Sequence, residues 1–361
     1  MFRPPQLPRT LEAALRDATS SKQAVRVEAI RDLVPYGAAG ATDDSASEVR
    51  ADVLRVVEAA LRDGAPQVRS AAAVALADLG ATQALPALLV AVEDDDAHVR
   101  QMAITALGEI GDARATERLR RALSDRRPEV RFQAVIAFPR VCASRADAMA
   151  ALLDATKDDD PLVVQIALRM AEEIGVGGKD DAGAATSRRE DDPVLARARE
   201  LVEDGPPVVR AAAAVLLART GDRSGQGVLV AVANGALAGV DGEDEAAAIE
   251  LVGELGLSEA TAGLEGRAFG AALSLRRDRF AWHARVALAR MGHARAARDI
   301  VAELGAWSRD KRTLAVAAVG RARLTDARPI VAAMRGDPNR AEPETVEETL
   351  ALLDGGRAAT A

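Results

Sequence analysis

The stretch DDDAHVRQMAITALGEIGD, residues 94–112, predicts a turn, then a helix, then a glycine stop. Its first three aspartates offer an N-cap and negative charge at a helix start, where unpaired N–H groups and the helix dipole favour both. Val99, Ala103 and Leu107 follow at helical spacing and share one face. Gly111 then ends the helix, because glycine tolerates a positive φ. The following residues 112–123 carry a second amphipathic pattern, so the unit is a helix hairpin.

Near-copies of this stretch recur along the chain. Clear copies end at Gly80, Gly111, Cys142, Gly175 and Gly221, and weaker ones end at positions 256 and 292. The clear stops are 31, 31, 33 and 46 residues apart, and the longest step contains a polar, glycine-rich insertion. A repeat of this length with two helices in each copy is typical of a helical solenoid.

The repeats predict an all-α, right-handed α-solenoid of about eight or nine helix hairpins. Residues 1–9 are proline-rich and are predicted to be a flexible lead. The array itself is predicted to span residues 10–340, with insertion loops at 37–47 and 176–192. A cap helix and tail are expected over 341–361, because a terminal repeat must face water on one side.

Composition excludes several classes of function. The chain has 361 residues, of which 49% are hydrophobic, 28% are charged and only 2% are aromatic. Its net charge of −8 disfavours binding to nucleic acid, which needs basic surface. The single cysteine allows no internal disulfide and fits a reducing cytoplasm. No run of about 18 apolar residues occurs, so no membrane insertion is expected.

The repeats resemble HEAT repeats, in particular the short type named after phycobilisome lyases, over roughly residues 20 to 335. The motif is an Asp before the second helix, Val-Arg at its start, Ala-Leu inside it and a closing Gly. It stands here as Asp63, Val68, Arg69, Ala75, Leu76 and Gly80; as Asp94, Val99, Arg100, Ala106, Leu107 and Gly111; and as Asp125, Val130, Arg131, Ala137 and Phe138. The chain departs from the motif where Val164 replaces the Arg, where Cys142 replaces the Gly, and where Pro139 predicts a kink. The resemblance implies the fold and says little about function.

The motif arginines Arg69, Arg100, Arg131 and Arg210 allow two interpretations. They could form a stripe that binds anions. The resemblance implies instead a structural ladder, in which each arginine pairs with an aspartate of a neighbouring turn. We expect the ladder.

The exposed face of the second helices is the candidate partner-binding surface, because in such solenoids these helices line the concave side. Two interpretations of its charges remain open: a mixed-charge groove for a peptide or protein, or salt bridges between neighbouring repeats. Phe132 is either an exposed anchor or a core filler beside Pro139. The candidate residues are Gln101, Thr105, Glu109, Phe132, Arg140, Gln165, Arg169 and Glu173.

Other reactive or aromatic residues carry weaker signals. His98, His283 and His293 lack convergent partners, so solvated histidines are expected rather than metal ligands or bases. Trp282 and Trp307 are expected to pack in the core near the end of the array. Cys142 is expected to be a small buried hydrophobe. No phosphate-binding loop, nucleophile motif or zinc spacing occurs, so we predict no cofactor, no metal and no catalytic residue.

The sequence therefore predicts a non-catalytic scaffold or adaptor in a bacterial cytoplasm that binds a partner protein or peptide through its concave face. The alternative is an accessory protein, similar to phycobilin lyases or chaperones, that acts on a partner protein. Only the repeat type implies this alternative, and the scarcity of aromatic residues disfavours it. Nucleic-acid binding is a third class, and the acidic composition disfavours it.

Overall fold

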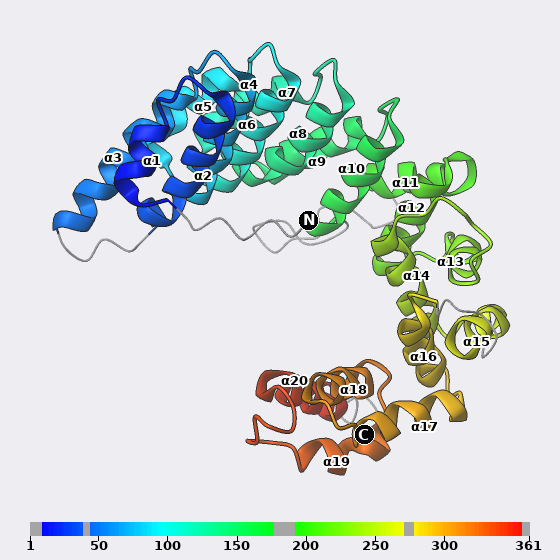
Figure 1. Cartoon of the computed structure of the whole chain (residues 1–361). Helices are drawn as coiled ribbons and strands as arrows, with labels where there is room; N and C mark the ends of the chain where they lie inside the picture. Colours follow the sequence, from blue (N-terminus) through cyan, green and yellow to red (C-terminus); the bar gives the residue numbers. More distant parts are fainter. Residues whose placement is uncertain (1–8, 39–43, 177–191, 271–277, 356–361) are drawn as a thin grey trace. The chain divides into compact units, whose positions relative to one another are not determined.

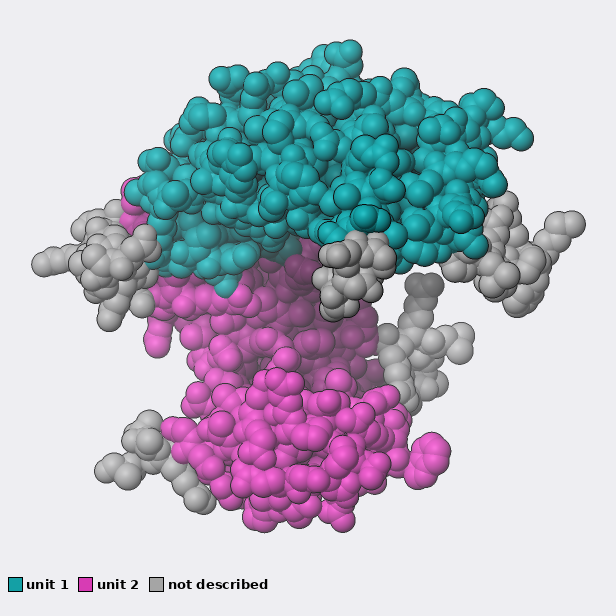
Figure 2. Space-filling view, turned by 90° about the vertical axis from the view of Figure 1, so that its left-hand side faces the viewer, with its two compact units in different colours: residues 1–182 teal, residues 183–361 magenta. Residues whose placement is uncertain are grey.

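The structure, a computed structural model, describes residues 9–38, 44–176, 192–270 and 278–355 (Figure 1). It divides into two compact units, residues 1–182 and residues 183–361 (Figure 2). All regular elements of the described residues are α-helices or short 3-10 turns, with no β-strand among them. The predicted lead over residues 1–8 and most of the predicted insertion, residues 177–191, lie outside the described residues.

The first unit contains ten α-helices in its described residues. They are α1 Leu11–Asp17, α2 Gln23–Ala38, α3 Asp44–Ala60, α4 Pro66–Asp78, α5 Leu85–Ala91, α6 Ala97–Ile110, α7 Thr116–Ala122, α8 Pro128–Val141, α9 Arg145–Ala155 and α10 Pro161–Glu173.

The second unit also contains ten described α-helices. They are α11 Pro193–Asp204, α12 Pro207–Arg219, α13 Gln226–Ala233, α14 Gly242–Leu255, α15 Thr261–Phe269, α16 Ala281–Arg290, α17 Ala294–Glu303, α18 Arg309–Arg321, α19 Arg328–Ala332 and α20 Pro343–Gly355.

In each unit consecutive helices pair into hairpins, and the second helix of each hairpin packs on the second helix of the next. This stacking confirms the predicted all-α solenoid class. The described helices form ten hairpins, rather than the eight or nine that the sequence suggested. The additional hairpin is α19 with α20, because α20 packs against both α18 and α19.

The local signals that begin and end the second helices work as the sequence indicates. At the start of α6, Asp96 Oδ1 accepts hydrogen bonds from the amides of His98 (2.9 Å) and Val99 (3.1 Å). At its end, Gly111 has φ 71°, in the left-handed region. Several other second helices begin instead with a proline at the first helical position, where its missing N–H costs nothing. These are α4, α8, α10 and α12.

Two boundaries differ from expectation. Helix α2 runs through Pro35 to Ala38, and α3 already begins at Asp44, so helix replaces much of the predicted loop at 37–47. Helix α8 likewise continues through Pro139 to Val141. Both prolines lie in the last turn of their helix, where each removes one hydrogen bond without interrupting the middle of the helix.

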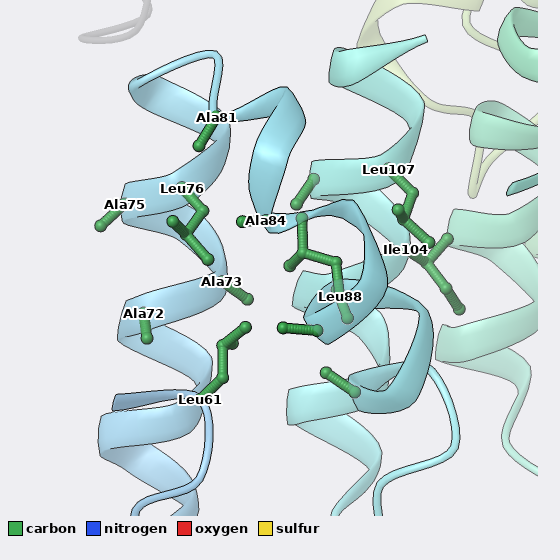
Figure 3. Packing of buried hydrophobic residues seen from close by; sticks show 14 of the residues in the cluster. Leu61, Ala72, Ala73, Ala75, Leu76, Ala81, Ala84, Leu88, Ile104 and Leu107 are labelled. Atoms are coloured by element: carbon green, nitrogen blue, oxygen red, sulfur yellow. The ribbon is translucent and has the colours of Figure 1, made fainter. Parts of the chain in front are cut away.

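Small and branched aliphatic side chains fill the space between the helices of the first unit. Figure 3 shows Leu76 of α4, Leu88 of α5 and Leu107 of α6 within one cluster, and each of these side chains is fully buried. Alanines separate these leucines and allow the helix backbones to approach closely. The second helices are thereby held as neighbours with fixed spacing.

Gly108→Ala should destabilise the first unit by about 1–3 kcal/mol, because a Cβ at Gly108 would lie 2.7 Å from Ala137 Cβ and 3.0 Å from Ala137 Cα. This overpacking outweighs the gain of up to about 1 kcal/mol that alanine brings to a helix interior. Gly266→Ala is the matched control, since nothing lies within 4 Å of a Cβ at that position of α15. Urea unfolding followed by circular dichroism should show opposite signs for the two variants, and equal signs would contradict the close approach of α6 and α8.

Candidate functional site

The motif arginines form the structural ladder that the resemblance implied. Arg69, Arg100 and Arg131 each hold both oxygens of an aspartate in the next repeat, namely Asp94, Asp125 and Asp158, at 2.6–2.9 Å. Each arginine also donates through Nη1 to the carbonyl of the residue six positions earlier. These guanidinium groups are fully engaged, so they do not form an anion stripe.

Two further arginines change the predicted membership of the ladder. Arg26 makes the same paired contact with Asp63, at 2.7 and 2.8 Å, although the sequence analysis did not include it. The signal was present, because Val25 and Arg26 repeat the Val-Arg of the motif. Arg210, in contrast, donates to the carbonyl of Val202 at 2.9 Å rather than to an aspartate.

The ladder shifts the titration of its carboxylates. For Asp94, Asp125 and Asp158, partial burial raises the pKa, while hydrogen bonds from the paired arginine and from a backbone amide two residues later lower it by more. For Asp63 the hydrogen bond from Arg26 is the largest cause, and the pKa is again below its ordinary value. All four carboxylates are therefore held ionised as part of the fold.

The predicted surface on the second helices is exposed only at one end. Glu109, Arg140 and Glu173, near the C-terminal ends of α6, α8 and α10, are exposed. Thr105 and Arg169, one turn earlier, are half-buried. The exposed residues of the predicted set therefore lie at the C-terminal ends of these helices, which we call the C-terminal face of the second helices.

The candidates in the second turn of these helices differ from one another. Gln101 and Phe132 are half-buried, and Phe132 is neither a fully exposed anchor nor a core filler. Gln165 is only 5% exposed. Spacing along the helix placed Gln165 on the same side as the other candidates, but packing within the unit buries its side chain, as it buries that of Ser70 in α4. Gln165 is thus removed from the candidate surface.

A groove lies between α2, α4 and α6, lined from Gln67 and His98 in the first turns of α4 and α6 to Asp78 in the last turn of α4. Its volume is ≈ 440 Å³, and its floor is largely apolar, with Val34, Val74 and Met102 among the lining side chains. Ala71 and Ala75 also line it, and their small side chains leave room between the neighbouring helices. Val74 is 41% exposed, which is unusual for a valine on a helix packed on both sides. The polar residues at the groove are Arg31, Gln67, Ser70, Asp78 and His98.

Three charged residues of the C-terminal face in the first unit do not pair with the described residues of neighbouring repeats. Asp78 of α4, Glu109 of α6 and Arg140 of α8 occupy equivalent positions, and none has an ion pair within the described residues. In the second unit such pairs do form, since Arg290 lies 3.4 Å from Glu254 and Arg321 lies 2.9 Å from Glu250. Among the described residues, the first unit therefore presents Asp78 at its groove, and Glu109 and Arg140 on the next two second helices, without ion pairs.

The histidines have no arrangement suited to metal binding. His98 lies at the groove, and His293 caps α17 by accepting from the Ala296 amide at 3.2 Å, with its other nitrogen 3.0 Å from Glu265. His283 packs edge-on against Phe280, with 5.7 Å between ring centroids. Within the residues that the structure describes, no group of three or more His, Cys, Asp or Glu side chains could hold a metal ion.

The expectation of buried tryptophans was wrong for Trp307, which is 99% exposed. Arg312 Nη1 donates to the carbonyl of Trp307, as Arg69 Nη1 does to that of Gly64. Trp307 therefore lies at the tip of a turn between two helices, where no neighbouring helix covers it. Trp282 is half-buried, and so is Cys142, whose thiol donates to the Ser144 carbonyl at 3.3 Å.

Comparison with known families supports the repeat assignment. The family model described as HEAT repeats matches residues 53–139. This part of the chain consists of HEAT repeats. The match covers α4, α5, α6 and α7 with the parts of α3 and α8 beside them, which includes most of the groove and three arginines of the ladder. No curated protein matches the sequence significantly.

Comparison with the solved structure of one protein shows the same class of fold. The Escherichia coli protein YibA is 17% identical, with a TM-score of 0.51, over 79% of this chain and 93% of that chain. At this identity the likeness shows the fold alone. A chain in the structure of the complex of CpcE and CpcF of phycocyanin lyase from Nostoc is 20% identical, with a TM-score of 0.42, over 73% of this chain and 96% of that chain. An engineered protein is 18% identical, with a TM-score of 0.38, over 95% of this chain and 98% of that chain.

None of the helices within the described residues combines the length and the apolar character needed to cross a membrane.

Proposed function

We propose that the protein is a non-catalytic scaffold that binds a partner protein or peptide through the C-terminal face of the second helices in its first unit. The observation that supports this proposal is the groove between α2, α4 and α6, with its partly exposed Val74 on an apolar floor. An apolar centre within a polar, water-accessible rim is the usual anatomy of a protein interface. The HEAT repeats of residues 53–139 supply rigid neighbouring helices on which such a surface can be held.

Exposed charged residues extend the proposed surface from the groove toward α8 and α10. Arg140 and Glu173 are exposed there, and half-buried Phe132 and Arg169 lie on the same helices. Rim charges of this kind contribute mainly to specificity and to the rate of association. We place the scaffold in a reducing cytoplasm, which a single cysteine supports. The lyase-like alternative stays a prediction from the repeat type.

Val74→Arg should weaken partner binding by about thirtyfold or more, because it puts a charged side chain on the apolar floor, and central contacts of this kind are commonly worth 2 kcal/mol or more. The measurement is affinity capture from a lysate of the source organism, followed by titration of the captured protein against each variant. Val90→Arg is the matched control, since Val90 lies on α5 and is 72% exposed outside this groove. A partner that binds Val74→Arg and the wild type equally would place the working surface elsewhere.

A further inference from the structure

We infer that the groove between α2, α4 and α6 selects a peptide segment in which a large apolar side chain is flanked by lysine or arginine. This inference rests on the proposed function, because it names the class of partner for the same surface. It is carried by two features of the first unit: the apolar floor of the groove, and the carboxylate of Asp78 at one end of it with Glu109 at the equivalent position on the next second helix.

The size of the groove limits what can enter it. Its volume of ≈ 440 Å³ is near the low end of the range of about 300–1,000 Å³ for ligand pockets. It is too small for a folded domain and suits one or two side chains of a bound segment. Val34, Val74 and Met102 offer such side chains aliphatic and thioether surface, and methionine adapts readily to different shapes. An aliphatic or aromatic anchor therefore fits the floor.

The charge at the groove is locally negative at one end. Asp78 lines the groove, and Glu109 holds the equivalent position on the next second helix. Both are exposed, and neither has an ion pair within the described part of the chain. Because the two carboxylates lack partners within the fold, a cation brought by a ligand would not have to displace an existing pair.

Two arginines nearby are held by other partners, and one of them, Arg50, donates to the carbonyls of Gly37 and Leu79. Arg31 lines the groove but is paired with Glu28 at 3.0 Å, on its own helix. His98 lies at the groove in the first turn of α6, whereas Asp78 and Glu109 lie in the last turns of α4 and α6. Arg140 stands on α8, which is one helix beyond the groove. The overall net charge of −8 adds long-range attraction for a basic segment.

The test is selection of a random library of linear 12-residue peptides, displayed on phage, against the full chain. Selected peptides, labelled with fluorescein, are titrated by fluorescence anisotropy against the wild type and the variants.

We expect the selected peptides to be enriched in a large apolar residue next to Lys or Arg. The double variant Asp78→Lys, Glu109→Lys should weaken these peptides about tenfold or more, and replacing their basic residue by Glu should restore part of the affinity to that variant. Asp78→Asn with Glu109→Gln should give a smaller loss, and circular dichroism checks that each variant is folded.

The outcomes separate this inference from the proposed function. Selected peptides that lose binding with Val74→Arg but not with Val90→Arg would support the proposed surface. If those peptides show no preference for basic residues, or do not respond to charge reversal, the inference is overturned and the proposed surface is retained. A selection that yields no peptide dependent on Val74 would count against both.

Discussion

Arg100→Met should destabilise the first unit by about 3–5 kcal/mol, which is the usual cost of removing one partner from a buried ion pair. Arg100 is only 5% exposed. It donates to both oxygens of Asp125, at 2.8 and 2.9 Å, and to the carbonyls of Asp94 at 2.9 Å and Asp95 at 3.2 Å. Methionine fills much of the same space but leaves a partly buried carboxylate and two carbonyls short of donors.

The two tryptophans allow the two units to be followed separately. Trp282 and Trp307 both lie in the second unit, and half-buried Trp282 should report its unfolding by fluorescence. Circular dichroism reports helices of both units. Arg100→Met should therefore shift a circular dichroism transition to lower urea concentration while the fluorescence transition stays in place.

The matched control for Arg100→Met is Arg55→Met, also in the first unit. Arg55 pairs with Asp52 at 2.6 Å, but its side chain is 74% exposed. Exposed pairs of this kind contribute about 0.2–1 kcal/mol at most, so the control should be close to neutral. If the two variants lost equal stability, the ladder would be no more important than ordinary surface pairs.

Features confined to one repeat could be predicted from the sequence. The N-cap at Asp96, the stop at Gly111 and the hairpin period all follow from local chemistry that recurs every 31 to 36 residues. The ladder was also predictable, because its arginines and aspartates keep fixed positions in each copy. An arginine could be assigned to the ladder wherever the next repeat has an aspartate at the motif position before its second helix.

Features that depend on how neighbouring repeats pack could not be predicted. Gln165 and Gln101 hold equivalent positions, yet Gln165 is buried and Gln101 is half-buried. Arg210 carries the motif but finds the Val202 carbonyl instead of an aspartate. The groove arises from small side chains on α4 between larger ones on α2 and α6. Such a combination is visible only when three helices are side by side.

The ladder also makes the first unit sensitive to acid. The folded-state pKa values of Asp63, Asp94, Asp125 and Asp158 lie below the ordinary value. The unfolded chain, with aspartate pKa values near about 3.9, then binds more protons than the folded chain below that pH. Stability from these groups is fully present above the unfolded-state pKa and is lost as the pH falls through the folded-state pKa values.

We therefore expect the free energy of unfolding of the first unit to change little between pH 7 and pH 5 and to fall below about pH 4. Each extra proton bound on unfolding contributes a slope of about 1.4 kcal/mol per pH unit, so four ladder carboxylates set an upper limit of about 5.5 kcal/mol per pH unit. Urea unfolding followed by circular dichroism at half-unit pH steps measures this slope. In Arg100→Met the slope should be smaller, because Asp125 loses the hydrogen bonds from Arg100 that lower its pKa.

The second unit provides the internal control for this acid response. In the second unit, burial raises the pKa of Asp222, but hydrogen bonds from Ser224 and Arg199 lower it by more. The first unit has the four ladder carboxylates, together with Asp17 and with Asp112, whose pKa Arg114 lowers to about 2. Because Arg210 donates to a carbonyl and does not continue the ladder in the second unit, the transition seen by Trp282 fluorescence should depend on acid pH less steeply than the transition of the first unit. Equal slopes would mean that general acid repulsion, rather than the ladder, controls unfolding below pH 4.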